Sequence, residues 1–407
     1  MGIPGSANPM LLGGGAVYEI EQSLRFDGTQ YLRRTIPSRS TIPGNVTVSF
    51  WLKKKDPIVP TYQYVSEAGN VSNNRSVIFL NTTSAFGDND VLSGTYHRGA
   101  TLQYGSRTNG VLRDPSAWYH AVVSYSGNAN TGTRKLWLNG VLESDITTTS
   151  TGNYPWFMWD VGTLGAAAYV SIGAVWVGGT LGDYPLYGYL AEYQAIDGQT
   201  LEASDFGEFD DNGVWRPIEY AGSYGDEGYY LKFDPSATNG IGHDHSGNGN
   251  NFSPTGFTTS GTGTDVMSDT PTTNWCTLDP LTNGSYATLS DGNLSAYGNS
   301  SSDNGNSRTN FAVTTGKWYC EFTCVASTGG YPQLGIMRQY DASRPNNGSP
   351  QSGYSSGMLY PTQSCSYWPN GQLSINSVDT LNWGSTWTAG DTIAIALDGD
   401  NGAVYFA

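Results

Sequence analysis

The sequences WYHAVVSY at residues 118–125 and KLWLNG at residues 135–140 decide the fold of this chain. Both are rich in aromatic and β-branched residues and are bounded by turn residues, a pattern typical of β-strands. The loop between them, GNANTG at 127–132, has the composition of a hairpin turn. The second half repeats the pattern with GKWYCEF at 316–322 and GDTIAIALD at 390–398. We therefore predict an all-β protein with two tandem antiparallel β-sandwiches.

The composition agrees with an all-β fold. The 407 residues leave room for two or three domains. Glycine contributes 53 residues, about twice its usual share, as expected where many tight turns need positive φ. Aromatic residues make up 13% of the chain, which excludes a disordered protein. Long helical periodicity is absent, and the best short helix is predicted over residues 197–206.

The formal net charge of −16 excludes several kinds of partner. Sequence-independent binding of nucleic acid needs a basic surface, so we expect no nucleic-acid partner. The same acidity argues against anionic lipid, and we expect no membrane insertion. The first residues lack a basic stretch followed by a long apolar core, so we expect no signal peptide. The protein is then made in the cytoplasm of the cell that expresses it.

The four cysteines all lie in the second half of the chain, at Cys276, Cys320, Cys324 and Cys365. Cys320 and Cys324 are four residues apart on one predicted strand, about 13 Å from each other, so they cannot form a disulfide. The sequence contains no CxxC pair, so we do not expect a zinc site. We expect the cysteines to be small buried residues, as suits a reducing compartment.

Five short motifs in the first half carry a resemblance to a known family. They are Phe26-Asp27-Gly28, Val48-Ser49-Phe50-Trp51, Trp118-Tyr119-His120, Leu136-Trp137-Leu138-Asn139-Gly140 and Gly188-Tyr189-Leu190-Ala191-Glu192. In this order they are similar to the laminin-G-like/concanavalin A-like lectin family. The resemblance covers residues 17–205. It implies a jelly-roll sandwich of two antiparallel sheets.

The segments on either side of this module are predicted to be an arm and a connector. Residues 1–16 are rich in Gly and Pro and read as an N-terminal anchoring arm that docks on a neighbouring subunit. Residues 206–275 are predicted to be a connector. Within it, 254–274 is rich in Thr, Gly, Ser and Pro, which is typical of a linker that crosses a surface.

Residues 276–407 resemble a second family. The stretches 318–325, 334–337 and 392–397 are similar to strands of a SPRY domain, which is also a β-sandwich. Residues 398–406 match the late hairpin of that family. Because the family continues with further strands after this hairpin, we expect a SPRY-like sandwich that is truncated at its C-terminus, and a longer natural protein.

The chain shows no pattern of catalytic residues. A glycoside hydrolase needs two carboxylates across one cleft. The acids at 143–145 follow a hairpin and those at 208–211 follow the first sandwich, so we expect solvated turn acids. No Gly-x-Ser-x-Gly elbow marks a serine hydrolase. The resemblance to the lectin family implies a packing role for His120. We therefore assign no catalytic residues and expect a protein that is not an enzyme.

Calcium is the single cofactor for which the sequence leaves room. Calcium takes six to eight oxygen ligands. GDND at 87–90 and the loop 244–251 are rich in such oxygens. Loops of this kind more often close turns with their side chains. We therefore assign no metal ligands and leave calcium open as a minor alternative.

Exposed aromatic residues are the best candidates for ligand binding. YPWFMW at 154–159 offers Tyr154, Trp156 and Trp159, which could stack on sugar rings. The alternative for these three residues is subunit contact or core packing. The loop YPLY at 184–187 leaves the same two alternatives open.

The combination of the two modules with a Ser-Gly-Asn-Gly-Asn segment at 246–250 resembles virion-associated proteins of marine bacteriophages. This resemblance implies a non-enzymatic structural protein on the virion surface, in a tail fibre or head fibre, that attaches to host-surface glycan. We expect a homo-oligomer whose arm binds other virion proteins. Two alternatives stay open: a purely architectural decoration protein that contacts virion subunits alone, and a polysaccharide depolymerase.

Overall fold

The computed structural model describes residues 18–36, 45–54, 62–70, 75–81, 91–98, 101–112, 114, 116–128, 131–149, 168–177, 180–181, 184–261, 264–274, 276–279, 287–290, 293–298, 307–311, 313, 315–326, 332–337, 364–376 and 378–407. The chain divides into two compact units between Trp275 and Cys276. We call Gly14–Trp275 the first module and Cys276–Ala407 the second module.

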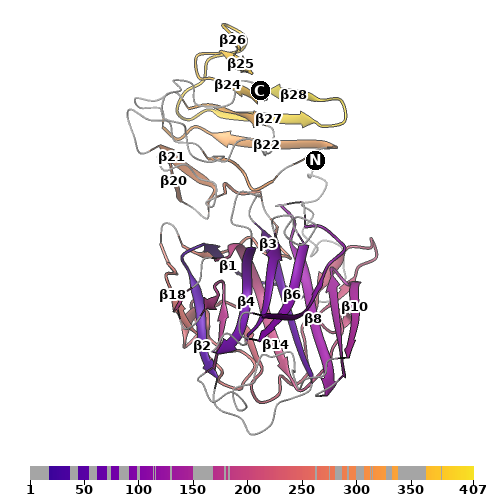
Figure 1. The fold of residues 1–407 in the computed structure, drawn as a ribbon. Coiled ribbons are helices and arrows are strands. Elements are labelled where there is room, and N and C mark those ends of the chain that lie inside the picture. Colours follow the sequence, from indigo (N-terminus) through magenta and orange to yellow (C-terminus); the bar gives the residue numbers. More distant parts are fainter. Residues whose placement is uncertain are drawn as a thin grey trace. The chain divides into compact units, whose positions relative to one another are not determined.

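Two antiparallel sheets build the first module (Figure 1). The larger has the order β10 (Val141–Thr149), β9 (Thr131–Leu138), β8 (Tyr119–Asn128), β3 (Asn45–Lys54), β14 (Tyr187–Asp197), β1 (Ser23–Asp27) and β19 (Val266–Met267), and β17 (Tyr229–Leu231) also pairs with β14. The other has the order β18 (Ser253–Thr255), β2 (Tyr31–Ile36), β11 (Ala168–Ile172), β4 (Tyr62–Asn70), β5 (Arg75–Asn81), β6 (Val91–Arg98) and β7 (Thr101–Arg107). Two short hairpins accompany them, β12 (Trp176–Val177) with β13 (Thr180–Leu181) and β15 (Gly207–Phe209) with β16 (Trp215–Pro217).

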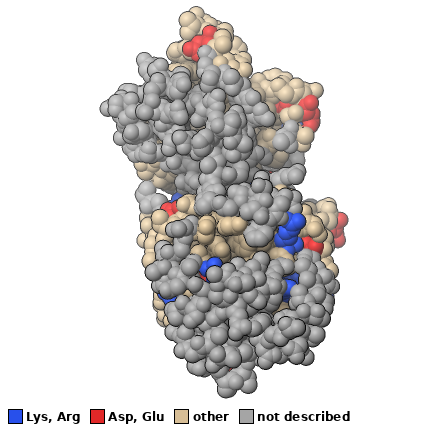
Figure 2. All heavy atoms as spheres, viewed as in Figure 1, with Lys and Arg blue, Asp and Glu red and all other residues tan. Residues whose placement is uncertain are grey.

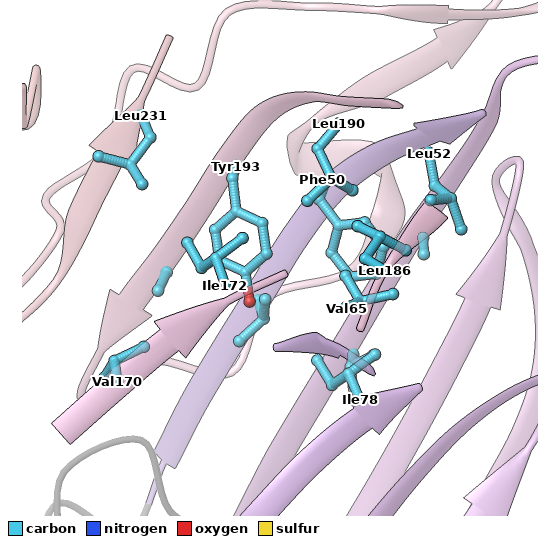
Figure 3. Close-up of a cluster of buried hydrophobic side chains, with 14 of the residues drawn as sticks. Phe50, Leu52, Val65, Ile78, Val170, Ile172, Leu186, Leu190, Tyr193 and Leu231 are labelled. Atoms are coloured by element: carbon cyan, nitrogen blue, oxygen red, sulfur yellow. The ribbon is translucent and has the colours of Figure 1, made fainter. Parts of the chain in front are cut away.

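The two sheets enclose one hydrophobic core (Figure 3). Phe50 and Leu190 point into it from the larger sheet, and Val65 and Val170 point into it from the smaller. The ring of Phe50 stacks on Tyr193 of β14 at a centroid distance of 5.5 Å. Alternate residues of each strand face the core, because successive side chains of a strand point to opposite faces. The predicted sandwich is confirmed for this half of the chain.

The structure corrects the prediction that residues 206–275 form a connector. β17 pairs with β14, β18 pairs with β2 and β19 pairs with β1, so the segment adds strands to both sheets. Its apolar residues Tyr229, Leu231 and Phe252 are buried in the core of the first module. The Thr- and Gly-rich composition of 254–274 resembled a linker because two short strands, β18 and β19, alternate there with tight turns.

The second module is also built from antiparallel strands. One sheet has the order β22 (Lys317–Thr323), β27 (Thr392–Asp398) and β28 (Ala403–Phe406). Another has the order β23 (Leu334–Met337), β24 (Ser364–Tyr367), β25 (Leu373–Ile375) and β26 (Val378–Thr380), and β20 (Ala287–Ser290) forms a hairpin with β21 (Ser295–Gly298). Both sheets contribute to a small core, in which Leu334 and Tyr367 meet Ile393 and Phe406. The all-β fold class is confirmed.

Two smaller expectations are corrected. In place of a helix over 197–206, the structure has a single 3-10 turn at Ala203–Asp205, because Asp197 still belongs to β14. After this turn Phe206 packs into a separate cluster with Ala203 and Tyr224. The other 3-10 turn of the described residues is Gly240–Gly242. No helix among the described residues is long and apolar enough to span a membrane. The cysteines are not uniformly buried, because Cys276 and Cys320 are exposed.

Candidate functional site

Three of the predicted features fall outside the described residues. They are the aromatic side chains Tyr154, Trp156 and Trp159, the arm 1–16 and the oxygen-rich loop 87–90. Each of them stays a prediction. The remaining candidate residues have defined positions and can be judged by their contacts.

The loop 184–187 packs into the first module. The ring of Tyr184 lies 5.5 Å from the ring of Tyr62 and 5.8 Å from that of Tyr64, measured between centroids. Leu186 is fully buried in the core. Of the two alternatives for this loop, ligand contact or packing, the contacts favour packing.

His120 on β8 is enclosed between aromatic rings. Its ring stacks on Trp51 at 4.7 Å, and the indole Nε1–H of Trp215 donates a hydrogen bond of 3.0 Å to Nδ1. Because the indole can only donate, Nε2 carries the imidazole proton and donates to Ser49 Oγ at 2.9 Å. Desolvation lowers the pKa of His120 to about 3. A neutral histidine that donates to Ser49 cannot accept that hydroxyl's proton, so the pair is not an activated nucleophile.

The acids first considered for hydrolysis, Glu143 and Asp210, are held by hydrogen bonds from neighbouring backbone groups. The carboxylate of Glu143 accepts hydrogen bonds from the backbone N–H groups of Asn109, at 2.9 Å, and of the next residue, at 2.7 Å. Asp210 accepts from the backbone N–H of Val214 at 2.9 Å and pairs with Arg216. These hydrogen bonds, the one from Val214 foremost, hold the pKa of Asp210 below its usual value. Asp210 closes the turn between β15 and β16, as expected, whereas Glu143 lies within β10 at its β-bulge and not in a turn.

A buried carboxyl that the sequence did not single out lies on β14. Glu192 is 5% exposed and has a φ of +51°, inside a β-bulge. Tyr18 donates a hydrogen bond of 2.7 Å to its Oε2, and the hydroxyl of Tyr230 donates to the same oxygen. Burial raises the pKa of Glu192. The tyrosines cover the carboxyl, so it ties two segments to β14 and is not presented to a polysaccharide.

The loop 244–251 is closed by its own hydrogen bonds. The Asp244 carboxylate accepts from the backbone N–H groups of Tyr230, Ser246 and Asn250, at 2.8 to 2.9 Å, and from the Ser246 hydroxyl at 2.9 Å. Four donors satisfy this carboxylate and surround it with N–H and O–H hydrogens, which disfavour a cation. In the part of the chain that the structure describes, no group of three or more His, Cys, Asp and Glu side chains could hold a metal ion.

Among the described residues, the surface best suited to ligand binding lies on the second module. Ile393 and Ile395 of β27 are buried, so Ala394 and Ala396 face outward from the three-stranded sheet. In the register of this sheet Ala396 lies directly between Tyr319 of β22 and Tyr405 of β28. We call these three residues the tyrosine platform.

The platform is open to solvent and has a flat floor. Tyr319 is 48% exposed and Tyr405 is 61% exposed. The two tyrosines are two strands apart, so their backbones are separated by roughly 9–10 Å. The small side chain of Ala396 leaves the space between the rings unfilled. Two exposed aromatic rings beside a floor of small residues can stack on apolar faces of a ligand.

Polar groups border the platform. Lys317 forms an ion pair with Asp398 on one side, and the Tyr319 hydroxyl donates to Glu321 on the other. Hydrogen bonds from Lys317 and Asn401 lower the pKa of Asp398 to about 2, so this carboxylate is ionised at neutral pH. Such groups can hydrogen-bond the hydroxyls of a ligand whose apolar face lies on the rings. In Figure 2 charged side chains are sparse on the described surface, in keeping with a composition of 13% charged residues.

The strands of the platform were predicted, but their use as a binding surface was missed. The signal was present in the alternation of Lys317, Tyr319 and Glu321 on one face of a predicted strand. The pairing of that strand with β27 and β28 could not be read from one sequence. Without the register, the two tyrosines had no reason to be considered together.

No protein-family model and no curated protein matches this chain. Among solved structures, it is similar to a candidate carbohydrate binding protein from Bacteroides ovatus, with 17% identity over 59% of each chain and a TM-score of 0.40. It is also similar to the LG1-3 region of the laminin alpha2 chain, with 10% identity over 97% of this chain and 56% of that one and a TM-score of 0.37. A third is a native heptameric SAP-like pentraxin from Limulus polyphemus, with 19% identity over 46% of this chain and 80% of that one and a TM-score of 0.34. The present chain thus spans less than two thirds of the length of the Bacteroides ovatus protein and of the laminin region.

Proposed function

We propose that this chain is a non-enzymatic structural protein of a bacteriophage particle that binds host-surface glycan through its β-sandwich modules. The observation that carries glycan binding is the tyrosine platform, with two exposed rings on either side of Ala396. The solved structures that resemble the chain include one named for carbohydrate binding. The sequence motifs of 17–205 and the SPRY-like motifs of the second half support a virion protein.

The chemistry of the platform favours a neutral glycan. Its border holds the acids Glu321 and Asp398 and one base, Lys317, which already pairs with Asp398. A sugar carboxylate or sulfate would add negative charge beside these acids and would be repelled. Neutral hexoses offer apolar ring faces to the tyrosines and hydroxyls to the border. Repeated copies on one particle would raise weak affinity per site into avidity.

A binding experiment tests the platform directly. Purified full-length protein is titrated with neutral polysaccharide from the host surface, and the Tyr319→Ala and Tyr405→Ala variants are compared with it. Each variant is expected to bind about tenfold more weakly, or about 1.4 kcal/mol, because it loses one stacked ring. Tyr297→Ala is the matched control, since Tyr297 is an exposed tyrosine, 69% accessible, on the β20–β21 hairpin. Equal binding by all four proteins would refute the platform.

The virion assignment is tested separately. Intact particles are labelled with gold-conjugated antibody against the chain. Label at fibre tips is the expected result for attachment, whereas label spread over the head favours the architectural alternative. Particles without any label contradict the virion assignment. Release of new reducing ends from the polysaccharide would contradict a non-enzymatic role and favour the depolymerase.

A further inference from the structure

The strand β22 forms an open edge of the second module. Among the described residues β22 pairs with β27 on one side, and no described strand pairs with its other side. Six of its seven residues are exposed, and the seventh, Phe322, is half-buried. The apolar Trp318 is 40% exposed although it shares a face with the buried Ile395. An open edge of this kind is a template for pairing with another strand.

The register shows which backbone groups face this edge. Cys324 donates its backbone N–H to Asp391 across the pair with β27, and Gly316 accepts from Gly399 on the same side. Backbone hydrogen bonds alternate along an antiparallel strand, so the even-numbered residues of β22 bond to β27. The odd-numbered residues Lys317, Tyr319, Glu321 and Thr323 therefore direct their N–H and C=O groups outward. Their side chains also share the outer face of the sheet.

The charges along the edge are complementary to themselves. When two copies of β22 lie antiparallel about a two-fold axis at Tyr319, Lys317 of each copy lies opposite Glu321 of the other. Opposite charges at directly facing positions stabilise a strand pair. Within the described residues no cation pairs with Glu321, whose carboxylate accepts from Tyr319 alone. This register also uses outward-facing residues of both strands for its hydrogen bonds.

We propose that a second copy of this chain docks edge to edge on β22, in the register that pairs Lys317 with Glu321. The contact is a two-fold symmetric interface in which the same surface of each copy is used. It joins two three-stranded sheets into one of six strands and brings the partner's Cys320 beside the exposed Trp318. Tyr405 and Tyr319 of one copy and the same two tyrosines of the second copy then form one row across the joined sheet. The inference concerns assembly and does not rest on glycan binding.

The charge register allows a test with single variants and their mixture. Wild-type full-length protein is expected to dimerise in analytical ultracentrifugation. Lys317→Glu places two acids opposite each other, and Glu321→Lys places two bases opposite each other, so each variant alone is expected to dimerise at least tenfold more weakly. An equimolar mixture restores opposite charges at both positions and is expected to recover the dimer. Circular dichroism of each variant verifies that it is folded.

A cross-link gives a second measurement if Lys317→Glu fails to fold. In a background of Cys276→Ser and Cys320→Ser, Tyr319→Cys places two thiols at facing positions of a hydrogen-bonded pair, about 5.5 Å apart at Cα, within disulfide range. Mild oxidation is expected to yield a covalent dimer. Glu321→Cys is the matched control, because residue 321 faces residue 317 and not itself. A monomeric wild type, an oligomer indifferent to both charge changes, or equal cross-linking by the two cysteine variants would each overturn the proposal.

Discussion

Two ion pairs between lysine and aspartate show how differently the two modules are built. In the first module Lys53 lies 2.7 Å from Asp269, and neither side chain is more than 2% exposed. In the second module the Lys317 side chain that pairs with Asp398 is 75% exposed. The buried pair fastens β3 to the returning segment after β19, whereas the exposed pair borders the tyrosine platform. The first module thus encloses this lysine–aspartate pair, and the second module presents its own pair to solvent.

The hydrophobic cores differ in the same direction. The core of the first module draws buried residues from both large sheets and is supplemented by two separate aromatic clusters. Among the residues that the structure describes, the core cluster of the second module contains four buried residues, Cys324, Tyr367, Trp387 and Ile393. Large apolar side chains such as Val325 and Leu381, at 83% and 69%, remain exposed there. The lesson is that a small core leaves apolar side chains available for contact with other molecules.

The largest effect is expected from breaking the buried ion pair. Asp269→Ala leaves the ammonium of Lys53 buried without its counter-charge and also removes the acceptor of the Trp118 indole. We expect the unfolding free energy of the first module to fall by about 3–5 kcal/mol. Urea unfolding followed by tryptophan fluorescence measures this loss. The matched change in the second module, Asp398→Ala, exposes Lys317 to water and is expected to leave stability nearly unchanged; similar losses would break the comparison.

The second effect is a loss of stability in acid. His120 has a folded pKa of about 3 against 6.5 for the free side chain, because burial disfavours its charged form. Below pH 6.5 the His120 side chain binds a proton in the unfolded chain but stays neutral in the folded chain. Stability is therefore lost as the pH falls toward 3. At pH 5 the loss is about 2 kcal/mol, from about 1.4 kcal/mol per pH unit. His120→Gln is expected to remove this slope in urea unfolding; an unchanged slope would contradict the assignment.

A weaker dependence of opposite sign is expected from Glu192. Burial raises the folded pKa of Glu192, so the folded chain binds a proton more readily than the unfolded chain does. Its ionisation therefore lowers stability as the pH rises from about 4.5 through the raised pKa, and protonation restores it. Glu192→Gln keeps an acceptor for Tyr18 and Tyr230 and is expected to flatten this part of the profile. If the variant keeps the wild-type pH profile of stability, the Glu192 carboxyl is not the source of this pH dependence.

Much of the fold could be predicted because strands carry a local signature. The alternation in 45–52 predicted that Val46, Val48, Phe50 and Leu52 share one face, and all four lie in the core. The Asn139-Gly140 turn was equally local, since both residues have positive φ, 48° and 79°, as a tight hairpin requires. The role of residues 206–275 could not be predicted, because it depends on pairing with strands far away in the sequence.

Functional residues were harder to predict for the same reason. Exposed aromatics in a continuous run, such as Tyr154, Trp156 and Trp159, attract attention in a sequence. Tyr319 and Tyr405 are 86 residues apart (405 − 319) and become neighbours through the register of β22, β27 and β28. The burial of Glu192 likewise depends on Tyr18 and Tyr230, which come from other segments. Sequence alone indicated which residues were in strands and left open which strands meet.

The return of the chain onto β1 has a consequence for how the protein is made. Ser23 Oγ donates to the backbone carbonyl of Asp269, across 246 residues. The sheet edge formed by β1 therefore stays unpaired on the ribosome until residues near 270 have emerged, and closing such a long loop slows folding. During that interval the nascent strand is exposed to aggregation. A fragment that ends at residue 205 would leave this edge of β1 permanently unpaired, whereas one that ends at residue 275 would pair it with β19.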